Sequence, residues 1–180
     1  MPRDMLKNLA NVVTFQAGWF TCVLGAATDH GWAGPLACII YLASHLWHLP
    51  DPARYLRFCT VVGFLGLAID STLGAFGIIT FHASPLPGWV CPPWLTALWM
   101  MFAGTLPLSL NWLTERPRLA ALLGALGGPA SYYAGASLGA IDLYNPSVTS
   151  LLILAVVWGI LMPALLRLKN RMGLQTLPAS

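Results

Sequence analysis

The chain has 180 residues, of which 57% are hydrophobic and only 8% charged, with a formal net charge of +3 and a mean hydropathy of +0.70. A soluble domain has about 45 to 50% apolar and about 25% charged residues, so this composition indicates an integral membrane protein and excludes a soluble catalytic domain. At about 20 residues per crossing, the length allows six spans. The sequence therefore predicts an all-α fold, in which residues 1–180 form one bundle of six transmembrane helices.

In chain order, the expected spans are the apolar runs between charged and turn-forming residues. They lie near residues 9–27, 32–49, 58–80, 94–113, 119–140 and 148–166, and residues 167–180 are expected to form a short basic tail. The connections "TDHG", "PDPAR", "HASPLPGWVCPP", "TERPR" and "DLYNPS" carry the Pro, Gly and Asp typical of breaks between helices. The six spans are therefore joined by short loops.

The basic residues predict the orientation, because Lys and Arg stay on the cytoplasmic side during membrane insertion. They precede the first span, lie in the second and fourth connections, or follow the sixth span: Arg3, Lys7, Arg54, Arg57, Arg116, Arg118, Arg167, Lys169 and Arg171. All of them fall on one side of a six-span arrangement, so both termini are expected in the cytoplasm. This topology accounts for the net positive charge, and we expect no nucleic-acid partner.

The first span has two readings. Arg3 and Lys7, an apolar run and the small residues up to Ala27 resemble a cleavable signal peptide. The apolar run is long for a signal, however, and it contains Gln16 and Trp19. A retained first helix is therefore the favoured interpretation.

The four cysteines do not suggest a disulfide framework. Cys22, Cys38 and Cys59 fall within expected spans, and only Cys91 lies outside them. We expect them to act as small apolar packing residues.

The second expected span carries a polar face. Cys38, Tyr41, His45 and His48 follow one another at helical spacing, and Gln16 of the first span lies at about the depth of His45. Two histidines three residues apart could bind a metal, but a lipid hydroxylase or desaturase would need more than the four histidines present. We expect no metal and no cofactor, and we expect these histidines to form hydrogen bonds with neighbours.

The third expected span contains an acid, Asp70, within "GLAIDSTLGAFG". Its helical face is otherwise made of glycines: Gly63, Gly66, Gly74 and Gly77. Small-residue faces allow another membrane helix to approach closely. Asp70 is therefore expected to point into the protein.

A similar face on the fifth expected span makes it the predicted packing partner of the third. It consists of Gly124, Gly128, Ser131, Gly135 and Gly139. Asp70 and Ser131 each follow an arginine of the preceding connection by 13 residues, which is roughly 20 Å of helix. The same count places Thr21 and Tyr41 at this level, next to Cys22, Ser71, Tyr132 and Tyr133, which predicts a polar layer around Asp70. The candidate ligand-binding residues are Asp70, Ser71, Tyr41, His45, Ser131, Tyr132 and Gln16.

The charge of Asp70 is expected to be suppressed. No Lys or Arg lies within an expected span to pair with it, and burial disfavours the charged form of a carboxyl group. We therefore expect Asp70 to be protonated near pH 7 and to donate a hydrogen bond, either to a backbone carbonyl or to Tyr41, Ser131 or Tyr132.

Four ordered motifs resemble a known family. They are "NVVTFQAGWFTCVLGAA", "DSTLGAFG", "PPWLTALWMMFAGTLPLSLNWL" and "GALGGPASYYAGASLGA". They are similar to the bacterial inner-membrane proteins grouped as domain of unknown function 2878. The resemblance implies a multi-pass protein of the bacterial inner membrane, and it implies no reaction, substrate or ligand.

Three classes of function remain open. The first is a protein that binds or moves a lipid or small apolar molecule through a cavity around Asp70, since an ionisable residue inside a membrane suggests a functional site. The second is a structural or accessory subunit, for which a membrane protein partner or a second copy of the chain would be needed. The third is an intramembrane lipid-modifying enzyme that uses Asp70 or a histidine as acid or base. Membrane lipids are the expected partners, and an enzyme is the less favoured class.

Overall fold

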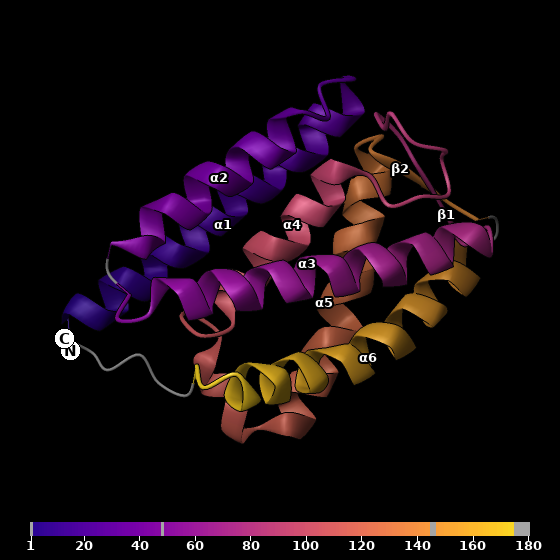
Figure 1. Cartoon of the computed structure of the whole chain (residues 1–180). Helices are drawn as coiled ribbons and strands as arrows, with labels where there is room; N and C mark the ends of the chain where they lie inside the picture. The colour runs from indigo at the N-terminus through magenta and orange to yellow at the C-terminus, as the bar shows by residue number, and fades with distance from the viewer. Residues whose placement is uncertain (1, 48, 145–146, 175–180) are drawn as a thin grey trace.

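The structure is a computed structural model that describes residues 2–47, 49–144 and 147–174. The described residues form a helical bundle, which confirms the all-α prediction (Figure 1). The helices and strands are α1 (Pro2–Ala27), α2 (Ala33–Leu46), α3 (Pro52–Ala75), β1 (Ile79–Phe81), α4 (Pro93–Thr105), the 3-10 helix η1 (Asn111–Glu115), α5 (Pro117–Ser137), β2 (Ile141–Leu143) and α6 (Ser147–Arg171).

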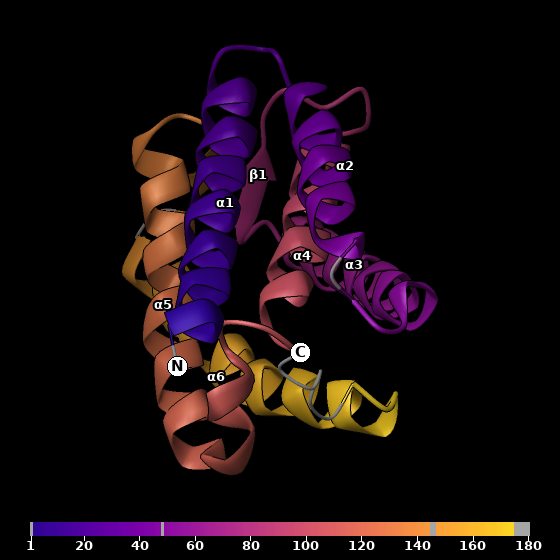
Figure 2. The ribbon, with the colours of Figure 1, turned by 90° about the vertical axis from the view of Figure 1, so that its left-hand side faces the viewer.

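Helix α4 is the centre of the first part of the bundle. It packs against α1, α2 and α3, while α1 and α2 also pack against each other and lie side by side in both views (Figures 1 and 2). Helices α5 and α6 form a second unit with extensive mutual contact. Aromatic rings join the two units, because Trp99 of α4 stacks on Trp158 of α6 with ring centroids 4.8 Å apart.

Local sequence explains where the helices begin and end. Helix α3 begins earlier than expected because the Asp51 side chain accepts a hydrogen bond from the Arg54 backbone N–H at 2.9 Å and a proline follows at the first helical position. Helix α4 ends at Thr105, short of the expected span, and Pro107 follows, which has no N–H to continue the helix. Helix α6 continues to Arg171, so residues 167–171 belong to the last helix and not to a tail.

Two short strands were not expected. Strand β1 pairs antiparallel with β2, with Thr80 opposite Asp142, and the sheet joins the segment after α3 to the segment after α5. A side-chain pair next to the sheet strengthens this link, since His82 Nε2 lies 2.7 Å from Asp142 Oδ2. The sheet and the Trp99–Trp158 stack together tie the two units of the bundle.

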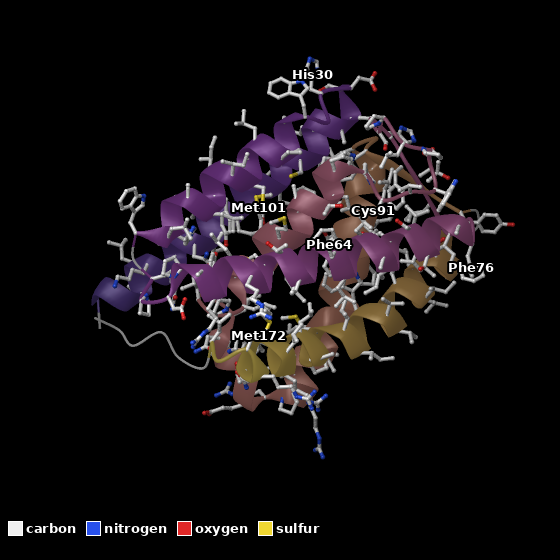
Figure 3. All side chains as sticks on the ribbon, in the orientation of Figure 1. His30, Phe64, Phe76, Cys91, Met101 and Met172 are labelled. Atoms are coloured by element: carbon white, nitrogen blue, oxygen red, sulfur yellow. The ribbon has the colours of Figure 1, made fainter. Side chains whose placement is uncertain are left out.

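Three of the described helices are long and apolar enough to cross a membrane, namely residues 5–27, 52–75 and 148–171, and α2 is a shorter apolar helix. Their outer faces carry large apolar side chains, such as Phe64, Val156 and Ile160, that are more than 60% exposed. Figure 3 shows these faces with their side chains, with Phe64 labelled on α3. Exposed apolar side chains of this size are compatible with a membrane protein.

Helix α6 also buries a basic residue. Lys169 is fully buried, and its ammonium group donates hydrogen bonds to Asn111 Oδ1 and, at 2.7 Å, to Thr114 Oγ1 of η1. The sequence placed Lys169 in a short basic tail, whereas the structure places it in α6, where η1 packs against the end of the helix.

Candidate functional site

The buried carboxyl group of Asp70 joins three helices. Tyr132 of α5 donates a hydrogen bond to Asp70 Oδ1 at 2.6 Å, and Trp99 Nε1 of α4 donates one to Asp70 Oδ2 at 2.7 Å. The Cys91 thiol lies 4.0 Å from Oδ2, at the long limit of a sulfur hydrogen bond. Asp70 itself is 0% exposed, so its inward orientation was predicted correctly.

The direction of these hydrogen bonds corrects one expectation. An indole N–H can only donate, and the tyrosine hydroxyl also donates, so Asp70 accepts both bonds. The prediction that Asp70 donates to Tyr41, Ser131 or Tyr132 is therefore wrong. Two donors on separate oxygens are the arrangement that suits an ionised carboxylate.

Tyr41 and His45 belong to a different polar cluster. The Asn11 amide nitrogen donates to the Tyr41 hydroxyl at 2.8 Å and lies 3.0 Å from His45 Nε2, and Ser109 donates to Asn11 Oδ1 at 2.6 Å. Helix α2 packs on α1 and α4. Asn11 of α1 contacts the polar face of α2 there. Equal depth along the helices therefore did not bring Tyr41 to Asp70. His48, predicted on the same face, lies outside the described residues.

Asn11 is a polar residue of this second cluster that sequence reasoning missed. It is 1% exposed and is the common partner of Tyr41, His45 and Ser109. The amide of Asn11 at the start of the apolar run "NVVTFQAGWF" was the available signal, because buried polar side chains need partners.

A cavity of about 890 Å³ lies between α1, α4 and α5. Its walls are mostly aromatic and aliphatic side chains and glycines, among them Phe15, Trp19, Phe20, Leu98, Trp99, Phe102, Leu123, Gly127, Tyr132, Tyr133 and Trp158. In Figure 2, α1 lies at the front, with α5 on one side of it and α4 on the other. Trp99 and Tyr132 line this cavity and also bond to Asp70, so the acid lies directly behind the wall.

The remaining predicted polar residues lie around the cavity or behind it. Gln16 is exposed and lines the cavity, as does Ser131, whose hydroxyl accepts a hydrogen bond from Trp19 Nε1 at 2.9 Å. Ser71 Oγ accepts a hydrogen bond from the Cys91 backbone N–H at 3.0 Å. The structure thus brings Ser71 and Tyr132 to Asp70, and Gln16 and Ser131 to the cavity.

The glycine faces of α3 and α5 do not pack on each other. On α3, Gly63 and Gly66 face Met100 and Trp99 of α4, and Gly74 faces the Trp89 backbone. On α5, both Gly124 and Gly128 face Trp158 of α6. The predicted α3–α5 crossing is wrong because each glycine face receives a large side chain from the next helix in the chain, from α4 for α3 and from α6 for α5.

The other predicted packing glycines have different roles. Gly77 and Gly139 follow α3 and α5 with φ of 68° and 87°, a left-handed conformation that favours glycine, so they are turn residues. Gly135 has more space around it than Gly124 and Gly128, since an added Cβ would lie 3.9 Å from the Ile141 side chain.

Cys91 is buried although it lies in the connection between α3 and α4, as a small packing residue would be. Burial raises the pKa of its thiol well above the usual value, which opposes reaction as a thiolate. Within the described ranges, no three His, Cys, Asp or Glu side chains come together as a metal site.

The fold and the site together define a helical protein with membrane-type apolar helices, in which a buried carboxyl group supports the wall of an apolar cavity. The family model "Protein of unknown function (DUF2878)" matches residues 8–164, so the chain belongs to this family, as its four motifs predicted. No curated protein and no solved structure matches the chain significantly.

Proposed function

We propose that the protein crosses the bacterial inner membrane six times, with both termini in the cytoplasm, and binds the apolar part of a lipid or another small apolar molecule in the cavity between α1, α4 and α5. The observation that carries this proposal is the cavity itself. Its volume of about 890 Å³ lies within the usual range for ligand sites, roughly 300 to 1,000 Å³, which are also mostly apolar with a few polar groups.

The exposure of the lining residues supports entry from the side. Phe20, Leu123 and Tyr133 line the cavity and are 40% exposed or more. They are therefore accessible on the outer surface of α1 and α5, which also carries exposed apolar side chains such as Leu126. In a bilayer this surface would face hydrocarbon, and an acyl chain could enter without crossing water.

Asp70 has a positioning role in this proposal. A ligand in the cavity would touch Trp99 and Tyr132, and both side chains are held in place by hydrogen bonds to Asp70. The carboxyl group is fully buried behind them. This arrangement favours binding over an enzyme in which Asp70 contacts the substrate.

The accessory-subunit alternative also has an observation in its favour. Both Asp70 oxygens are hydrogen-bonded within the chain, as expected of a purely structural group. Retained lipid separates the two functions, because an accessory subunit needs no ligand in the cavity.

The test fills the cavity and measures what the protein retains. An added Cβ at Gly127 would meet no atom within 4 Å, and Gly127 lines the cavity. Gly127→Trp should therefore place an indole in the cavity and reduce the lipid that mass spectrometry detects on the gently purified protein. Gly127→Ala and Leu126→Trp are the controls, since Leu126 is 63% exposed and outside the cavity lining. Equal lipid retention by all three variants would contradict the proposal.

A further inference from the structure

A second, basic cleft lies between the start of α3 and the end of α6. It has a volume of about 650 Å³ and is lined by Asp51, Ala53, Arg54, Arg57, Val61, Arg171 and Met172. In Figure 3, Met172 lies at the end of α6 on the side of α3. Three arginines and a single carboxylate give the lining an excess of positive charge.

Arg54 forms the fixed side of this cleft. Its Nε lies 3.1 Å from Asp51 Oδ2, and its Nη1 donates to the Gly173 carbonyl at 3.2 Å. Gly173 has a φ of 76°, and an added Cβ would lie only 2.9 Å from Arg54 Nη1. The turn that ends α6 is therefore shaped around the guanidinium group of Arg54.

The other two arginines that line the cleft are Arg57 and Arg171. Asp51, the acid of the cleft, is already paired with Arg54. Arg57 and Arg171 are exposed, and neither forms an ion pair with a carboxylate among the residues that the structure describes. Two guanidinium groups from different helices thus face one cleft, and no carboxylate in the described part of the chain pairs with either, an arrangement suited to a phosphate group.

The apolar surface next to the arginines indicates where the rest of the ligand would lie. Arg54, Arg57 and Val61 share one face of α3, and the exposed Leu65 continues that face toward the middle of the helix. A molecule with a phosphate in the cleft would therefore have its apolar part along α3. Exposed apolar side chains suit acyl chains and do not suit a water-soluble phosphate.

We propose that this cleft binds the headgroup of an anionic phospholipid of the cytoplasmic leaflet, with its phosphate on Arg57 and Arg171 and its acyl chains along Val61 and Leu65. Basic pockets between helices on the cytoplasmic side are suited to such headgroups. The site is separate from the cavity between α1, α4 and α5 and does not depend on ligand binding there, but its place at the cytoplasmic leaflet rests on the orientation proposed above. The protein would then hold one phospholipid specifically at this cleft.

The test compares two charge-matched double variants of the full chain, purified in a neutral detergent. Arg57→Gln with Arg171→Gln removes the two unpaired arginines of the cleft. Arg118→Gln with Arg167→Gln removes two exposed arginines that do not line it. Thermal unfolding in detergent first confirms that both variants are folded.

Binding of phosphatidylglycerol and of phosphatidylcholine is then measured by native mass spectrometry. The unchanged protein should prefer phosphatidylglycerol, and the cleft variant should bind it about 30-fold more weakly, at about 1 kcal/mol for each arginine lost. The control variant should keep its affinity. Equal losses in the two variants, or equal binding of the two lipids, would overturn the proposal. Complete displacement of phosphatidylglycerol by millimolar inorganic phosphate would also overturn it, in favour of a soluble phosphate ligand.

Discussion

The hydrogen bond from Tyr132 to Asp70 can be isolated by a double-mutant cycle. The O–H···O distance is 2.6 Å, and Asp70 is 0% exposed, so water cannot replace the lost hydroxyl. A hydrogen bond to a charged group contributes about 1.5 to 3 kcal/mol. Tyr132→Phe should therefore lower the free energy of unfolding by about 2 kcal/mol, while Tyr133→Phe, on the neighbouring residue that is 57% exposed, should change it little.

The Tyr132→Phe substitution should not destabilise a protein that already lacks Asp70. In an Asp70→Leu protein the Tyr132 hydroxyl is buried without its acceptor, so its removal should cost nothing or restore some stability. The two substitutions should therefore be coupled by about 2 kcal/mol. The measurement is denaturant or thermal unfolding in detergent micelles for all four proteins of the cycle. Purely additive effects would refute the structural role assigned to this bond.

Two further predictions concern topology and packing. A cysteine introduced at the exposed Leu86 should react with a membrane-impermeant thiol reagent in intact cells, and one at Glu115 should react only after lysis; the reverse pattern would contradict the proposed orientation. Gly74→Ala should sharply reduce the yield of folded protein because its methyl group would overlap the Trp89 backbone, whereas Gly135→Ala should be tolerated with ordinary contacts. Equal yields of the two glycine variants would show that the close approach of Trp89 to α3 is unimportant.

The sequence was sufficient for the helical class, the inward orientation of Asp70 and its nearness to Tyr132. The helical class follows from composition. The orientation of Asp70 and its nearness to Tyr132 follow from the regular geometry of single helices, through a glycine face and a count of residues along each helix. The sequence was insufficient to predict which helices pack against each other, because a glycine face shows that some element packs closely without showing which one. The α3 and α5 faces have the same pattern, yet they receive Trp99 and Trp158 from different helices.

The main omission at the site was Trp99. Within "WLTALWMMFAGT" it reads as one more apolar residue, although an indole N–H buried in the middle of a helix needs an acceptor. Asp70 was the acid available to accept it. The two strands could not be predicted, since each has only three residues and is held by pairing with the other.

The spacing of the Asp70 cluster along the chain has a consequence for synthesis. Trp99 follows Asp70 by 29 residues and Tyr132 follows it by 62. In the proposed membrane arrangement, a chain inserted from its N-terminus therefore brings in α3 before α4 and α5, which carry the two donors. During that interval the acid must rely on water or the insertion machinery, at a cost of roughly 2.5 to 3.5 kcal/mol on insertion scales. The arrival of α5 is thus the step at which the early helices become committed to their final arrangement, and nascent chains that stop before Tyr132 should be preferred substrates for membrane proteases.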